Sequence, residues 1–91
     1  MQPFRFAVQG GPWRDPDATV TLARLVESLG YDELYSSDHV GGADPYVPLV
    51  FAAAATERIS FGPLVLNNEF HHPALLARTV ATADVVSGGR M

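Results

Sequence analysis

The spacing of hydrophobic residues along the chain predicts three β-strands. Phe4, Phe6 and Val8 alternate with smaller or polar residues, which is the two-residue period of a strand. The strands are expected over residues 4–9, 32–39 and 59–66. The third is almost continuously apolar, which is typical of a strand covered on both faces. Because Pro63 has no N–H group for the sheet, we expect a bulge or bend around residues 62–64.

Helix-start signals and helical periodicity predict one helix after each strand. The helices are expected over residues 16–29 and 46–56, with a third from Pro73 to the Ser87-Gly88-Gly89 stop. The apolar face expected for the first helix consists of Leu22, Leu25, Val26 and Leu29. Arg24 and Glu27 fall outside this face and are expected to be solvated. Strand and helix in repeated alternation predict an α/β fold with a parallel sheet and right-handed crossovers.

Composition limits the class of protein and its partners. The 91 residues suffice for one small domain, and 47% hydrophobic with 18% charged residues indicates a globular chain. The formal net charge of −4 argues against a nucleic-acid partner. The chain has no cysteine, no secretory signal pattern at its start and no apolar run long enough to span a membrane. We therefore expect a soluble cytoplasmic protein without a membrane partner.

Polar residues stand at or just after the ends of all three predicted strands, and a parallel sheet gathers its strand ends along one edge. These residues are Gln9, Asp38, His39, Asn67, His71 and His72. An aspartate beside a histidine suits proton transfer, because imidazole titrates near neutral pH. The structural alternative is that Asp38 caps a helix and that His39 forms an ordinary hydrogen bond.

Other interpretations of these residues stay open. Asp38 and the three histidines could converge on a metal ion, but no His-x-His or His-x-x-x-His spacing occurs, and we predict no metal site. The alternative for His71 and His72 is a solvated loop ahead of the third helix. Trp13, in the loop after the first strand, either packs on the domain or contacts a ligand. Neither glycine pair has the spacing of a nucleotide-binding loop.

Several motifs, taken together, resemble the bacterial luciferase-like family. They are Phe4-Arg5-Phe6 with Gln9, Leu29-Gly30-Tyr31-Asp32, Ser37-Asp38-His39, residues 53–59, 64–68 and 72–78, and the run 84–90. They cover almost the whole chain in order, and the similarity is greatest to the branch that uses the deazaflavin coenzyme F420. The resemblance implies a TIM-type (β/α)8 barrel. It also implies a monooxygenase or a hydride-transfer dehydrogenase that acts on a small organic substrate with F420 or, alternatively, FMN.

The same resemblance assigns roles to individual residues. His39 is expected to be the catalytic residue, near the reactive face of the coenzyme ring. The residues expected to bind the coenzyme are Asp38, His39, Leu64, Val65 and Asn67, and Trp13 is expected in the substrate pocket. A non-proline cis peptide is expected near Leu64–Val65. Pro63 stands where relatives commonly have threonine.

Length separates this chain from a complete family barrel. Such a barrel needs eight βα units and about 250 residues, whereas three units are predicted here. Residues 1–91 are therefore expected to be the N-terminal portion of a luciferase-like barrel domain, whose parent enzyme is a homo-oligomer, expected to be a dimer. One alternative is a non-catalytic remnant, or a split-barrel piece that needs another chain. A second alternative is a metal-dependent barrel hydrolase. The isolated 91-residue chain is expected to be inactive.

Overall fold

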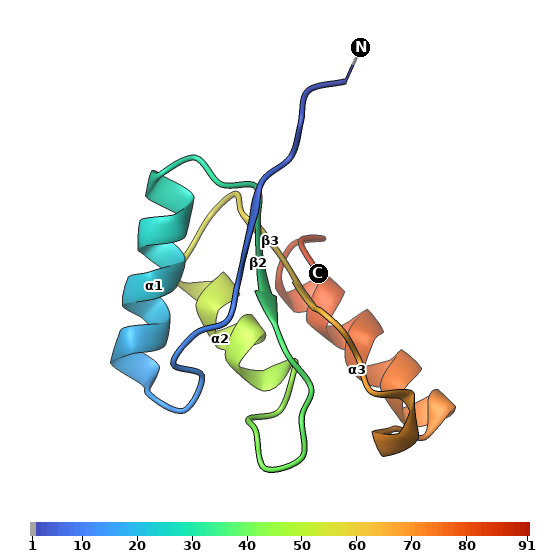
Figure 1. Cartoon of the computed structure of the whole chain (residues 1–91). Helices are drawn as coiled ribbons and strands as arrows, with labels where there is room; N and C mark the ends of the chain where they lie inside the picture. The colour runs from blue at the N-terminus through green and yellow to red at the C-terminus, as the bar shows by residue number, and fades with distance from the viewer. Residues whose placement is uncertain (1) are drawn as a thin grey trace.

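The computed structural model describes residues 2–91 as a three-stranded sheet flanked by helices (Figure 1). The strands are β1 (Ala7–Gln9), β2 (Glu33–Ser36) and β3 (Ser60–Pro63), in the order β1-β2-β3. The helices are α1 (Pro16–Ser28), α2 (Val47–Ala54), α3 (Pro73–Val86) and a short 3-10 helix, η1 (Asn68–Phe70). Both strand pairs are parallel, with Leu34 opposite Val8 on one side and Phe61 on the other. The predicted parallel α/β arrangement is confirmed.

The core lies where α1 and α2, which contact each other, pack against the sheet. Its buried members are Ala23, Val26, Leu34, Leu49, Ala52, Ala53, Ile59 and Phe61. The alanines of α2 have small side chains, so that helix can approach its neighbours closely. This packing holds β2 and β3 together and thereby fixes where their ends lie.

The buried face of α1 differs from the predicted one. Thr19, Ala23 and Val26 are buried, whereas Leu25 and Leu29 are 51% and 65% exposed. Thr19, Ala23 and Val26 stand at positions i, i+4 and i+7 and form the side of α1 that faces the core. This side is rotated away from the more hydrophobic side of the helix. Periodicity locates the apolar side of a helix, but the neighbouring elements decide which side is covered.

All three strands are shorter than predicted, and the prediction of a third strand covered on both faces is wrong. Phe4 and Phe6 precede β1 and are 89% and 62% exposed. Leu64 and Val65 follow the end of β3 at Pro63 and are 43% and 69% exposed. Hydrophobicity alone does not distinguish a residue that a neighbour covers from one at an open edge. The chain does bend directly after Pro63, close to the predicted position.

The sequence pattern predicts that Glu27 is solvated, but its side chain is half-buried. Its carboxylate links α1 to the turn before β3 through hydrogen bonds. Its Oε2 atom accepts hydrogen bonds from the backbone N–H groups of Glu57, Arg58 and Ile59 at 3.0, 2.7 and 3.0 Å. Burial by itself would raise the pKa of Glu27, but these hydrogen bonds and the charge of Arg58 lower it overall. The fold therefore favours the ionised carboxylate.

Replacing Glu27 with glutamine is expected to lower the free energy of unfolding by about 2 kcal/mol, because three amides lose a charged acceptor. The wild-type contribution is complete above the pKa of an unfolded glutamate, about 4.3, and is lost as the pH falls through the lower folded-state value. Urea unfolding at about pH 7 and about pH 3 measures both effects. E57Q is the control, since the exposed Glu57 side chain makes none of these bonds. Equal stability of E27Q and wild type at neutral pH would contradict this role.

The end of α3 is attached to the rest of the molecule through Arg90. Among the residues of α3, Ala83 is the buried one. The Arg90 carbonyl accepts a hydrogen bond from the Phe61 N–H at 2.7 Å, so the chain after α3 runs beside β3. The Arg90 guanidinium lies 5.8 Å from the centre of the Phe61 ring, a cation–π contact. These contacts place α3 on the β3 side of the sheet (Figure 1).

Candidate functional site

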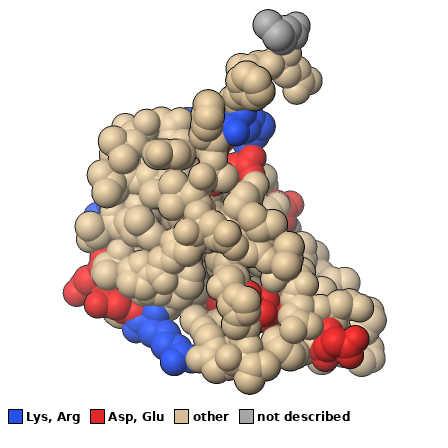
Figure 2. Space-filling view, viewed as in Figure 1, with Lys and Arg blue, Asp and Glu red and all other residues tan. Residues whose placement is uncertain are grey.

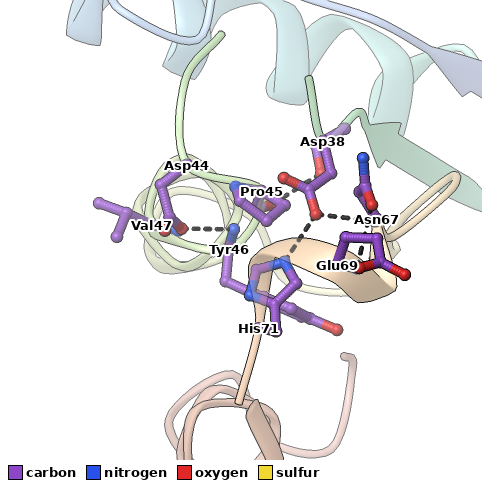
Figure 3. A network of polar contacts seen from close by, with 9 residues as sticks. Asp38, Asp44, Pro45, Tyr46, Val47, Asn67, Glu69 and His71 are labelled. Carbon is purple, nitrogen blue, oxygen red and sulfur yellow. Dashed lines mark hydrogen bonds and ion pairs between the residues drawn. The ribbon is translucent and has the colours of Figure 1, made fainter. Parts of the chain in front are cut away.

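Asp38 joins the loops that follow β2 and β3 at one edge of the sheet (Figure 3). It lies just beyond the end of β2 and is 8% exposed. Its Oδ2 atom accepts hydrogen bonds from His71 Nε2 at 2.6 Å and from the backbone N–H of Asn67 at 2.9 Å. One carboxylate oxygen therefore holds two neighbouring strand ends together.

The hydrogen bonds of Asp38 determine its charge. Burial by itself would raise the pKa of Asp38, but the bonds from His71 and Asn67, together with nearby histidine charge, lower it overall. Tyr46, at the start of α2, is buried, and this burial together with the charge of Asp38 raises the pKa of the Tyr46 phenol. The edge thus carries an ionised carboxylate with an un-ionised phenol nearby at neutral pH.

The structure brings the predicted polar residues to the same edge. His39 follows Asp38 directly and is exposed. Asn67 contacts Asp38 through its backbone, while its side-chain oxygen accepts a hydrogen bond from the Glu69 N–H at 3.1 Å and caps η1. Asp38 does not cap α2, because Asp44 accepts the Tyr46 and Val47 amides there, at 2.8 and 2.9 Å.

A second set of hydrogen bonds links the ends of all three strands. The Leu64 N–H donates to the Ser36 carbonyl at 2.8 Å, and the Gln9 side-chain amide donates to the Leu64 carbonyl. The Leu64–Val65 peptide bond is cis, as the family resemblance implies. Because Leu64 and Val65 are partly exposed, an apolar surface lies at the same edge as the Asp38 carboxylate.

Trp13 packs on the domain, which is one of the two interpretations made from the sequence, while ligand contact stays a prediction. It packs against the core and closely covers Gly11, where an added Cβ would lie 2.9 Å from the indole ring. It also lines a cavity of about 540 Å³ between the loops that follow β1 and β2. Arg14 ties these loops together, since its Nη2 donates to the carbonyls of Gly41 and Gly42 at 2.7 and 2.9 Å. Packing therefore holds Trp13 at a cavity beside the strand-end edge.

The histidines do not form a metal site. Within residues 2–91, no group of three His, Cys, Asp or Glu side chains could hold a metal ion. His72 turns towards α3, where its Nδ1 accepts the Ala74 N–H at 3.1 Å, while His71 turns to Asp38. The described chain therefore offers no ligand set for a metal-dependent hydrolase.

Sequence reasoning missed the pairing of His71 with Asp38 and treated His71 as a metal ligand or a solvated loop residue. A usable signal was present. A carboxylate expected at a buried strand end needs donors, and the loop after the neighbouring strand is the nearest source of them. His71 lies in that loop.

The six Lys and Arg positions of the sequence are all arginines. On the face shown in Figure 2, the visible basic groups lie apart from one another, with acidic groups between them. Within residues 2–91, no helix has the length and apolar character to cross a bilayer.

Comparison with known proteins gives the family. The family model described as luciferase-like monooxygenase matches residues 1–91. The chain belongs to the luciferase-like monooxygenase family. A 5,10-methylenetetrahydromethanopterin reductase of Methanopyrus kandleri is 30% identical over 90 residues, which cover 99% of this chain and 26% of that protein. This luciferase-like chain therefore spans about a quarter of the length of that relative.

Solved structures agree with this luciferase-like assignment. The coenzyme F420-dependent tetrahydromethanopterin reductase of M. kandleri matches with a TM-score of 0.88 and 29% identity, over 98% of this chain and 26% of that one. The oxygenating constituent of 3,6-diketocamphane monooxygenase from Pseudomonas putida, solved with FMN, matches with a TM-score of 0.81 and 23% identity, over 97% and 28%. The three βα units thus correspond to part of a luciferase-like TIM barrel, as predicted.

Proposed function

We propose that residues 1–91 are the N-terminal portion of a luciferase-like oxidoreductase and contribute its strand-end coenzyme site. The observation that carries the proposal is the Asp38 carboxylate, which holds the ends of β2 and β3 together. F420 is the proposed coenzyme, because the M. kandleri reductase, which has the same fold over this chain, depends on it. FMN, with which the P. putida monooxygenase was solved, is the alternative. The proposed substrate is a small organic molecule.

The residues at this edge suit a planar ring. Leu64 and Val65 expose apolar side chains that can cover one ring face and exclude water from it. The ionised Asp38 and the exposed imidazole of His39 offer polar partners at the ring edge. When bound, F420 supplies hydride transfer and FMN supplies oxygen activation. The part of this chain is to orient the ring, to hold a proton at His39 and to border the substrate with Trp13.

The proposal is tested by titrating the 15N-labelled chain with F420 and, separately, with FMN while its amide signals are recorded. We expect F420 to shift the signals of the strand-end residues 38, 39, 64, 65 and 67. Signals near Ala7 and Ser60, at the opposite ends of the strands, should stay unchanged. Affinity in the millimolar range is expected, because three strands form the site where a whole barrel has eight. Tighter binding of FMN would reassign the coenzyme.

A split-barrel piece that needs another chain is the second candidate function. The exposed apolar face of α3 favours it, since Leu75, Val85 and Val86 are 53%, 78% and 61% exposed. Absence of any amide shift with both coenzymes would support this alternative over a coenzyme site in the isolated chain. It would leave the family assignment, which rests on the whole sequence, unchanged.

A further inference from the structure

The proposed coenzyme site uses Asp38 to hold two strand ends together, and it assigns no chemistry to the Asp38–His71 pair. The two side chains come from different loops and approach to 2.6 Å between Oδ2 and Nε2 (Figure 3). The Asp38 side chain is 6% exposed and the His71 side chain is 20% exposed. A contact this short between partly desolvated groups is a strong, charge-assisted hydrogen bond.

The carboxylate determines which nitrogen of His71 carries the proton. An ionised carboxylate can only accept hydrogen bonds, so the hydrogen of a neutral His71 ring must lie on Nε2. The lone pair then lies on Nδ1. Within residues 2–91 no group donates a hydrogen bond to His71 Nδ1. Every fully buried side-chain nitrogen or oxygen in this range has a hydrogen-bond partner, so Nδ1, which has none, is accessible to solvent. In His72, by contrast, Nδ1 is already occupied by the Ala74 N–H.

We propose that Asp38 and His71 form a proton-transfer dyad, in which His71 Nδ1 takes a proton from a bound molecule and Asp38 stabilises the resulting imidazolium. In this step the bond from hydrogen to an acidic oxygen of the ligand breaks, and the N–H bond at Nδ1 forms. The electron pair stays on the ligand oxygen. The site changes from a carboxylate beside a neutral ring to a carboxylate–imidazolium ion pair. The dyad needs no coenzyme and thus goes beyond the proposed function.

The surroundings of His71 indicate the class of ligand. His71 lines a cavity of about 630 Å³ whose other walls include Leu76, Val80 and Met91. Asp84 also borders this cavity, and Asp38 lies behind the ring. Two carboxylates disfavour a ligand that arrives as an anion, and the oxyanion formed by the transfer is balanced by the new imidazolium of His71. The apolar walls favour hydrocarbon. The dyad therefore suits a small, neutral, mostly apolar molecule with one acidic O–H group.

The first test is nitrogen NMR of the histidine rings in the wild-type chain, without any coenzyme. We expect His71 to be a single Nε2–H tautomer, with a downfield and slowly exchanging Nε2 proton. H71Q and H72Q assign the signals, and H72Q should leave the His71 pattern unchanged. A His71 ring that averages over both tautomers, or that carries its proton on Nδ1, would overturn the proposal.

The second test measures the reactivity of Nδ1 with diethyl pyrocarbonate, followed by peptide mass spectrometry. Nδ1 attacks a carbonyl carbon, the anhydride C–O bond breaks, and ethyl carbonate leaves, takes up the ring proton through solvent and decomposes to ethanol and CO2. We expect D38A to slow modification of His71 roughly tenfold, because the carboxylate that stabilises positive charge on the attacking ring is gone. Modification of the exposed His39 serves as the internal reference, and circular dichroism checks that D38A is folded. A folded D38A chain with an unchanged His71 rate would refute the dyad.

Because neither test contains F420 or FMN, their outcome is separate from that of the coenzyme titration. A fixed Nε2–H tautomer without coenzyme binding would support the dyad and reject the coenzyme site in this chain. Coenzyme-induced shifts at residues 64, 65 and 67, together with a His71 ring that exchanges between its two tautomers, would support the coenzyme site and reject the dyad.

Discussion

Replacing His39 with alanine is expected to lower kcat about 10²- to 10³-fold, because a positioned imidazole contributes proton transfer of that size. The measurement requires an enzyme in which this chain is joined to the remaining barrel units of its M. kandleri relative. The His39 side chain is exposed and makes no hydrogen bond within residues 2–91, so its loss should leave the fold intact, and kcat should fall much more than the coenzyme affinity. Stopped-flow single turnovers and a coenzyme titration separate the two quantities.

A matched control for His39 is H72N, because His72 is also an exposed loop histidine and asparagine retains its ability to cap α3. This variant should keep wild-type kcat. If H39A also kept wild-type kcat, His39 would have no part in the reaction. If H39A lost coenzyme affinity at constant kcat, it would be a binding residue and not a proton carrier.

Replacing Arg90 with alanine is expected to lower the free energy of unfolding by about 3 kcal/mol, because its guanidinium donates to several buried or half-buried oxygens of distant segments. Nη2 donates to the carbonyls of Ala53 and Thr56 at 2.7 and 3.2 Å. Nη1 donates to Thr56 Oγ1 and to the Ile59 carbonyl at 3.0 and 3.2 Å. Nε donates to the Ser87 carbonyl at 2.8 Å. One side chain thus joins the ends of α2 and α3 to the start of β3.

A chain of this length has a total stability of roughly 5–13 kcal/mol, so a loss of this size is easily measured by urea unfolding. Hydrogen exchange should show that α3 becomes unprotected before α1 and α2, since Arg90 is its main polar attachment to α2 and β3. R78A is the control, because Arg78 is an exposed arginine of α3 whose side chain takes no part in this network. An R90A chain as stable as R78A would show that apolar contacts alone hold α3.

Much of the candidate site could be read from the order of elements. Parallel pairing of β2 with β3 requires their following loops to share one edge, and Asp38 accordingly bonds to the Asn67 amide. The helix-start signals at Pro16 and Pro73 also marked the first residues of α1 and α3. These features depend on neighbouring residues and on the handedness of βα units, both of which the sequence contains.

Other features could not be predicted because each depends on a partner far along the chain. Glu27 looked solvated by periodicity, yet it binds amides that lie about thirty positions later. His71 looked like an isolated loop residue, although Asp38 receives its hydrogen bond. The covered side of α1 likewise depends on α2, which places Ala23 in the core and leaves Leu25 exposed.

The sequence by itself determined the succession of strands and helices, the parallel sheet and the family, because turn chemistry, periodicity and motif order act over short distances along the chain. The tertiary structure alone decided how the carboxylates of Glu27 and Asp38 and the guanidinium of Arg90 are used. A charged group leaves water only where donors or acceptors converge on it, and that convergence arises when distant segments pack together.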